Sequence, residues 1–542
     1  MRDGYALAAL VSGSIRGGAG SGPHWAARGP SRRNSPALAP LGRRFQRGDG
    51  TSVSSDWWDV GGVMEDGDHS RRWVWALPIV ALLSLAAAMV AISSPAQAIP
   101  SFARQTGQPC GTCHTDFPNL TPYGRLFKLN GYTIGGSRFR TTPFPTSEED
   151  RTKPWWPPIS TMAIVGFTHN QTPLGPPPPT ILPLSPNDNV IVSPVSFFWG
   201  GAITEHIGAF AQVTYNAPGP GGLAAPVGSD PFGHTWTWDN TDLRYANTTR
   251  IGGLNVLYGI TANNNPTVQD VWNTTPAWIF PQAVSTLGNG FGPGTIIEGA
   301  FAAHVVSTGG YLWINDLFYV EATAYHTLDA NTQNRLGTDP LGSPGLFDVA
   351  PYWRVAFEPH WGRNWLMLGT FGMYAPVHPW LFPNTGTLDT SAQTDKFTDI
   401  GVDAQYQYQG DNFWFTLRGS YIREHERLDA SSFLFGTNAS NDLNSLRLLA
   451  SLAYGNDNRI VLTAQRFQTW GTPDPVVFGG SPDTSGWIAE IAYIPFVTST
   501  APWWPWFGAR IGLQYTFYDK FNGTSAGASA NNTLFLHAWF AM

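Results

Sequence analysis

The sequence predicts an all-β fold: a 16-stranded antiparallel outer-membrane β-barrel, preceded by a small α-helical segment. Three observations carry this prediction. From Pro157 onward, runs of roughly ten residues alternate apolar and polar side chains, as in strands that face lipid on one side and a lumen on the other. The connections between these runs alternate between long and short. No later stretch reaches the roughly 18 continuous apolar residues of a membrane-spanning helix.

Composition supports the barrel. Charged residues are 13% and aromatic residues 14% of the chain, with 24 tryptophans, 59 glycines and 44 prolines. That aromatic content suits the two interfacial girdles of an outer-membrane barrel. A large aromatic-rich β-sandwich or propeller has a similar composition, so the strand pattern has to decide between them.

The first 98 residues have the pattern of targeting material. Residues 1–63 lack apolar periodicity, and we interpret them as an upstream extension from a misassigned start, with Met64 as the true start. Residues 64–98 predict a signal peptide: Arg71 and Arg72 precede an apolar run, and Ala96-Gln97-Ala98 has the small residues of a cleavage site. Left uncleaved, that run is long enough to anchor the chain. Removal of residues 1–98 leaves 21 basic and 31 acidic residues, a balance that disfavours a nucleic-acid partner.

The chain's only two cysteines lie in the motif Cys110-Gly111-Thr112-Cys113-His114. This spacing is typical of covalent haem attachment, in which two thiols form thioethers to the porphyrin and the adjacent imidazole binds the iron. A redox disulfide or half of a zinc site is the alternative. A zinc site would need further ligands close by, and the next histidine is His169. The motif therefore predicts one covalent haem c, held by Cys110, Cys113 and His114.

Residues 99–151 form the predicted monohaem cytochrome c segment, and residues 152–542 form the barrel. In the segment, Thr121 and Pro122 resemble an N-cap and a first helical residue, which predicts a short helix over 123–130 that ends at Gly131. About fifty residues cannot bury a porphyrin alone. The haem segment is therefore expected inside or against the barrel.

The sixteen predicted strands keep one face apolar and the other polar, as Phe413, Phe415 and Leu417 alternate with Trp414 and Arg418. An even number of strands leaves both ends of the chain in the periplasm. The last strand alternates up to Met542, which resembles the terminal signal of outer-membrane assembly. The predicted strands are 159–168, 191–201, 207–215, 236–246, 253–262, 300–313, 317–326, 351–358, 365–375, 397–408, 413–424, 442–454, 459–470, 485–494, 507–518 and 532–542.

A second iron ligand has to come from the barrel, because the haem segment holds no methionine and no other histidine. Met162, on the face of the first strand assigned to the lumen, is the first candidate, since thioether ligation raises a haem's potential. His169, at the end of the same strand, is the alternative. Each has an ordinary explanation as well, in packing for a methionine and in a satisfied polar contact for a histidine.

Charged residues recur on the predicted lumenal face, where they could pair with haem propionates, with Arg104, Arg125 and Lys128, or with one another across a hydrated lumen. They are Asp242, Arg244, Glu321, Arg354, Glu358, Asp403, Arg418, Arg447, Glu490 and Arg510. The longest predicted external loop begins at Asn263; its Asp270 could meet a cation, although a structural constriction is the more common use of such a loop. The sequence has no motif for hydrolytic or transferase chemistry.

The haem end resembles the fused outer-membrane cytochrome–porins that oxidise extracellular ferrous iron. The resemblance rests on Pro100 to Gly107 leading into the cysteine motif, then on Leu120 to Tyr132, and more loosely on the loop from Asn263 to Trp278. It implies an oxidoreductase in which Cys110 and Cys113 hold the haem, His114 is the proximal ligand, and the cytochrome segment plugs a sixteen-stranded pore. It leaves the distal ligand open.

These observations lead to one main hypothesis and two alternatives. The main one is an outer-membrane cytochrome that takes electrons from extracellular Fe(II) and passes them to a periplasmic cytochrome or other acceptor. The first alternative keeps the electron conduit but uses another extracellular donor or a partner cytochrome. The second is a passive porin with a structural haem plug.

Overall fold

The computed structural model describes residues 100–136, 140–143, 145, 148–173, 185–215, 236–338, 340, 343–378, 393–495, 497–498 and 504–542. The expected signal peptide and upstream extension lie outside these residues. No helix among the described residues is long and apolar enough to cross a membrane.

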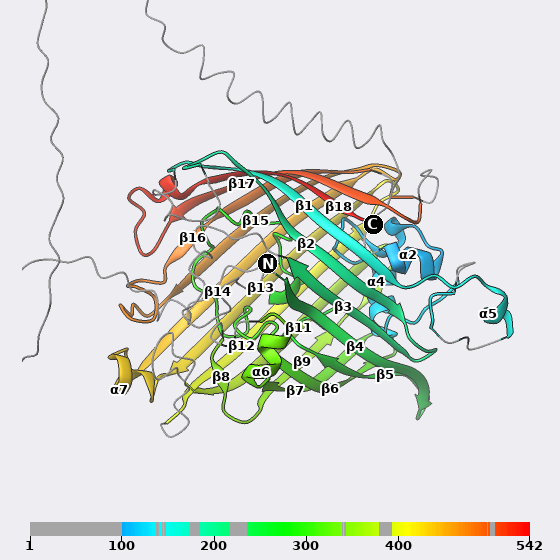
Figure 1. Cartoon of the computed structure of the whole chain (residues 1–542), viewed down its shortest axis with the longest axis horizontal. Helices are drawn as coiled ribbons and strands as arrows, with labels where there is room; N and C mark the ends of the chain where they lie inside the picture. The colour runs from blue at the N-terminus through cyan, green and yellow to red at the C-terminus, as the bar shows by residue number, and fades with distance from the viewer. Residues whose placement is uncertain are drawn as a thin grey trace, which may run out of the picture. The chain divides into compact units, whose positions relative to one another are not determined.

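The wall is a closed barrel of 16 antiparallel strands (Figure 1), because the first strand pairs with both the second and the last. Closure leaves no strand edge unpaired, which is the condition for a sheet that lies in lipid. Two short pieces, β8 (Gly345–Leu346) and β10 (His360–Trp361), extend the pairing at the rims. The wall strands are β1 (Ile159–Asn170), β2 (Asn189–Ala202), β3 (Ile207–Tyr215), β4 (Trp236–Ile251), β5 (Leu254–Asn263), β6 (Val305–Ile314), β7 (Phe318–Thr327), β9 (Ala350–Phe357), β11 (Asn364–His378), β12 (Asp395–Gln409), β13 (Phe413–Arg427), β14 (Ser440–Tyr454), β15 (Arg459–Gly471), β16 (Thr484–Ile494), β17 (Gly508–Lys520) and β18 (Thr533–Ala541).

The predicted strand positions are confirmed with one correction. The run 300–304 was expected to open a strand, yet it forms turns, Ala303 has a φ of 66°, and β6 begins at Val305. The apolar side chains of Ala300 and Phe301 pack inside the barrel, so their composition resembles that of a strand without its backbone.

Side chains along each strand alternate between the two faces of the wall. In β13, Trp414, Thr416 and Arg418 are buried, while Leu417 is exposed. Large apolar side chains such as Ile400 and Val402 are exposed on the outer face of other strands. An apolar outside and a polar inside are the arrangement of an outer-membrane barrel, and the sequence prediction of this alternation is confirmed.

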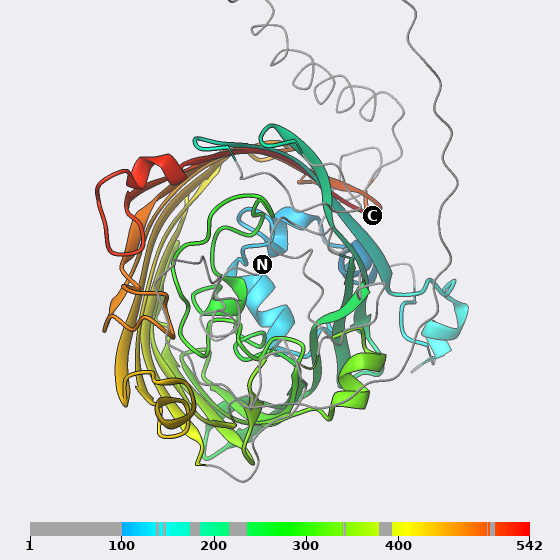
Figure 2. The same cartoon turned by 60° about the vertical axis from the view of Figure 1, so that its left-hand side comes forward.

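Two segments lie within the ring of strands (Figure 2). The lumenal segment, residues 100–136, contains α2 (Pro100–Thr106), α3 (Cys110–Cys113) and α4 (Pro122–Leu129). The inward loop, residues 264–304, joins β5 to β6 and contains the short η2 (Pro276–Trp278). The sequence predicts this loop as an external connection; in the structure its Val268, Val271 and Trp272 are almost fully buried.

The remaining helices are short and lie outside the lumenal segment. They are α5 (Glu148–Thr152), α6 (Ala330–Arg335), α7 (Ser431–Phe435) and η3 (Ala528–Asn531).

Candidate functional site

The cysteine motif forms a single helical turn, α3, inside the barrel. Pro109 precedes it, and the amide of His114 donates to the carbonyl of Cys110 at 2.9 Å. Residues three apart lie on the same side of a helix, so this turn brings the two thiols to one face. The thiols are not joined by a disulfide. Cys110, Cys113 and His114 all line one cavity.

Helix α4 fixes the back of the motif. The hydroxyl of Thr121 accepts from the amide of Gly124 at 3.2 Å, which confirms the predicted N-cap. The amide of Thr121 donates to the carbonyl of Cys113 at 2.9 Å. A Cβ on Gly124 would lie 2.2 Å from that same carbonyl oxygen, so only glycine fits at this position.

Three arginines of the wall bind the chain just after the cysteines. Arg459 of β15 donates to the carbonyls of His114 and Thr115. Arg510 of β17 donates to the carbonyl of Phe117 at 2.8 Å, and Arg418 of β13 donates to Asn119 Oδ1 at 2.7 Å. So short a segment cannot satisfy its own backbone acceptors, and the guanidinium groups supply the missing donors. Arg418 and Arg510 were expected on the lumenal face; Arg459 was not singled out.

Helix α4 also joins the wall and the inward loop. Arg125 and Glu358 form a buried ion pair, with side chains 3% and 8% exposed, and Glu358 also accepts from the indole of Trp272. Lys128 Nζ donates to the carbonyl of Val268 at 2.7 Å and to that of Asp270 at 2.8 Å. Burial lowers the pKa of Lys128 to about 7. The lumenal segment is therefore held on both sides.

Asp270 has a structural role in the inward loop. Its carboxylate accepts from the amides of Trp272 and Thr274, each at 3.0 Å, and lies 3.4 Å from the guanidinium of Arg354. These partners occupy the carboxylate, so the structure favours a loop constriction over a cation contact at this residue.

The cavity beside the motif has a volume of about 630 Å³. Around the motif, aromatic and aliphatic side chains dominate the lining. They are Phe102, Phe117, Phe127, Met162, Ile164, Phe198, Phe210, Trp278 and Trp539. Ligand pockets of drug-sized and cofactor-sized molecules measure about 300–1,000 Å³ and are mostly apolar. The volume, the apolar lining and the two thiols with their imidazole therefore fit a covalently attached porphyrin.

Burial sets the protonation of the motif. It lowers the pKa of His114 to about 4, so the imidazole is neutral at neutral pH, the form that binds metal ions. Burial raises the thiol pKa of Cys110 and of Cys113 to about 12, with mutual repulsion adding to the effect at Cys110. Unreacted thiols at this site are therefore protonated.

The structure separates the two candidates for a second iron ligand. Met162 is 8% exposed, belongs to the apolar cluster around Phe127 and Trp539, and lines the same cavity as His114. His169 is bonded instead to Asp188, with Nδ1 to Oδ1 at 2.7 Å, and is not among the residues that line the cavity. Since Thr168 and Asn170 on either side of it are the buried, lumenal residues, His169 lies on the opposite face of β1, and we discard it as a ligand.

Three further histidines and methionines of the wall, His326, Met367 and Met373, and His304 of the inward loop also do not line the cavity. Met162 therefore remains the candidate.

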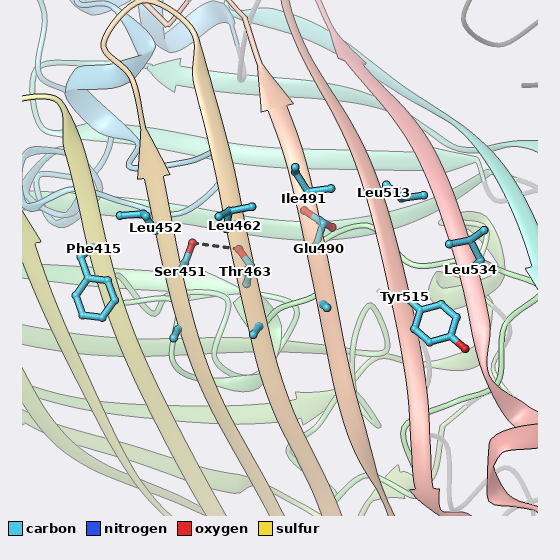
Figure 3. Close-up of a pocket in the computed structure, with 13 residues that line it drawn as sticks. Phe415, Ser451, Leu452, Leu462, Thr463, Glu490, Ile491, Leu513, Tyr515 and Leu534 are labelled. Carbon is cyan, nitrogen blue, oxygen red and sulfur yellow. Dashed lines mark hydrogen bonds between the residues drawn. The ribbon is translucent and has the colours of Figure 1, made fainter. Parts of the chain in front are cut away.

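A second hollow, of about 540 Å³, lies on the outer face of β13 to β18 (Figure 3). Its rim includes Leu462, Ile491 and Leu513, which are exposed apolar side chains. The one acidic residue beside it, Glu490, is buried and paired with Arg510. This hollow faces the region expected to hold lipid and presents no reactive group.

Known proteins give only distant likenesses. No family model matches the chain, and no curated protein matches it. Among solved structures, Vibrio cholerae OmpT, an outer membrane protein, has a TM-score of 0.37 at 8% identity, covering 71% of this chain and 96% of its own. Pseudomonas putida OprB gives 0.39 at 13% identity, covering 71% and 92%, and Salmonella typhi OmpF gives 0.38 at 11%, covering 71% and 97%.

Proposed function

We propose that this protein is a monohaem outer-membrane cytochrome that takes electrons from extracellular Fe(II) and passes them to periplasmic carriers. One observation carries the proposal: Cys110, Cys113 and His114 line a single cavity of about 630 Å³ inside a closed barrel. A haem attached there would supply one-electron chemistry at the iron.

Different residues would hold different parts of the haem. Cys110 and Cys113 would form the thioethers, and His114 would provide the proximal nitrogen. Arg459 binds the carbonyl of His114 at 2.6 Å and so fixes the backbone that carries the imidazole. Gly124 lets α4 pack directly on the carbonyl of Cys113. Both contacts orient the attachment residues before any ligand arrives.

Met162 is the proposed distal ligand. Its side chain lines the same cavity and is nearly excluded from solvent. A thioether favours the reduced iron and raises the potential of a haem, which suits a reaction with a donor as weakly reducing as aqueous Fe(II) in acid.

Ferrous iron is the proposed donor for two reasons. The sequence around the motif resembles the iron-oxidising cytochrome–porins. In addition, ferric iron precipitates near neutral pH, so a cell gains by leaving the metal outside and importing only its electron.

The lumenal segment occupies the inside of the barrel, which is not expected of a freely open pore. Buried contacts such as Arg125 with Glu358, and Tyr132 Oη with Asp242 at 2.7 Å, tie it to the wall. A passive porin would instead let small solutes through.

The test mixes purified protein with Fe(II) under anoxic conditions from acidic to neutral pH. The reduced haem bands should appear in the native protein and be absent from a C110S/C113S double variant, which keeps the barrel without the attachment thiols. If the native protein carries haem that dithionite reduces and Fe(II) never does, the donor is not iron. Solute entry into protein-containing liposomes at the rate of an open porin would favour the passive alternative.

A further inference from the structure

The cavity that holds the cysteine motif is lined by polar as well as apolar side chains. One group of polar residues comes from β3, β4 and the inward loop. Its residues are Gln212, Thr214, Asp239, Asn240, Asn265, Ser285, Thr286 and Glu298. We call this part of the lining the polar chamber.

The strand ends place the polar chamber further along the barrel than the motif. Arg459, which binds the carbonyls of His114 and Thr115, is the first residue of β15 and follows the short connection from β14. Thr214 and Asp239 instead lie near the ends of β3 and β4 that the long connection between these strands joins. Outer-membrane barrels put their long connections outside the cell. The polar chamber therefore lies on the external side of the motif.

Two carboxylates line the polar chamber. Asp239 accepts from the hydroxyl of Thr214 at 2.7 Å and from the amide of Asn240 at 2.8 Å. Glu298 accepts from the hydroxyl of Ser445 at 2.8 Å and from the amide of Thr295 at 2.9 Å. These donors hold each carboxylate in place, and none of them is a cation.

The positive charges nearby are already engaged. Lys128, which also lines the cavity, has its ammonium group on two backbone carbonyls and over the ring of Trp278 at 4.5 Å. Arg447 Nη2 lies 3.9 Å from Glu298 Oε1, so it offsets part of that charge, whereas no cation among the described residues forms an ion pair with Asp239. The described lining thus holds two carboxylates and one occupied ammonium group, a balance that favours cations.

We propose that the polar chamber receives the electron donor as a hydrated divalent cation, held by Asp239 and Glu298 through its water shell. This inference rests on the proposed function and specifies where the donor stands. The ferrous donor would lose one electron and become ferric, a ferric haem held by Cys110, Cys113 and His114 would accept that electron, and no bond would form or break. The ferric product leaves with its water.

Two variants, D239N and E298Q, test the polar chamber by removing one charge each at nearly constant shape. The second-order rate of haem reduction by Fe(II) should fall about tenfold in each, the size of effect expected when a charged cleft loses its attraction for a substrate. Reduction by dithionite, an anion, should stay the same or become faster. The matched control is E205Q, which changes an exposed carboxylate in the turn between β2 and β3 and should leave both rates unchanged.

The native protein offers a second measurement that needs no variant. Excess Mn(II), a divalent cation that does not reduce haem, should slow reduction by Fe(II) and leave reduction by dithionite unaffected. If Fe(II) fails to reduce the native protein, the proposed function is wrong. If Fe(II) reduces the native protein and Mn(II) has no effect, or if D239N and E298Q react with Fe(II) at the native rate, the polar chamber is not the donor site.

Discussion

The contact between Gly124 and the cysteine motif gives the sharpest mutational prediction. In G124A the new Cβ would lie 2.2 Å from the carbonyl oxygen of Cys113, whereas real Cβ contacts essentially never fall under 3.0 Å. The helix and the motif must therefore separate by at least about 0.8 Å. That movement would stretch the 2.9 Å hydrogen bond from the Thr121 amide to the same oxygen beyond hydrogen-bond length. Overpacking of this kind costs about 1–3 kcal/mol.

The assay is the amount of covalent haem per chain after expression with the haem-attachment machinery. G124A should carry a small fraction of the native haem while its strands still form, which circular dichroism can report. G135A is the matched control, because Gly135 is in the same segment and a Cβ there meets nothing within 4 Å. Full haem occupancy and an unchanged spectrum in G124A would refute the packing of α4 against the motif.

Three further predictions concern other residues around the cavity. E358Q leaves the buried Arg125 without its charge partner, which should lower the free energy of unfolding by about 3–5 kcal/mol. The lumenal segment should therefore loosen, and ion conductance in planar bilayers should rise. The control D411N removes the exposed ion pair with Arg363 and should leave conductance at the native level. M162L should keep covalent haem but lose the sulfur-to-iron charge-transfer band and lower the potential, and a native band in M162L would exclude Met162 as ligand. Because the folded pKa of Lys128, about 7, lies below its ordinary 10.5, the unfolded chain binds more protons between these values. Stability against urea should therefore rise from about pH 7 to 10.5 in the native protein relative to K128M, and parallel pH curves for the two would show that the amine is not buried.

The strand pattern made the barrel predictable. Period-two alternation is a local property, and in β13 it predicts that Trp414 and Arg418 face the lumen and that Leu417 faces outward, as the structure shows. Turn-rich composition likewise marked the loop after Asn263. The strand prediction was wrong at residues 300–304, where apolar residues form turns that pack inside the lumen. Composition alone cannot distinguish such turns from a strand.

The proposed attachment residues could also be predicted from the sequence, because their motif depends on spacing along the chain. The surroundings were not. Arg459 lies far from His114 in sequence, and only barrel closure brings its guanidinium to that carbonyl. Nothing in the sequence near Gly124 indicates that a side chain is excluded there, because the exclusion comes from its contact with the carbonyl of Cys113. His169 and Met162 were both candidates on the first strand, and only the structure shows that Met162 alone of the two lines the cavity.

The proposed function requires that electrons cross this barrel while solutes do not. The most direct measurement uses sealed liposomes that contain the haem-loaded protein and enclose oxidised cytochrome c, with Fe(II) added only outside. We expect the enclosed cytochrome to become reduced, and liposomes with the C110S/C113S variant to show no such reduction. Equal reduction with that variant, or none with the native protein, would contradict the proposed function.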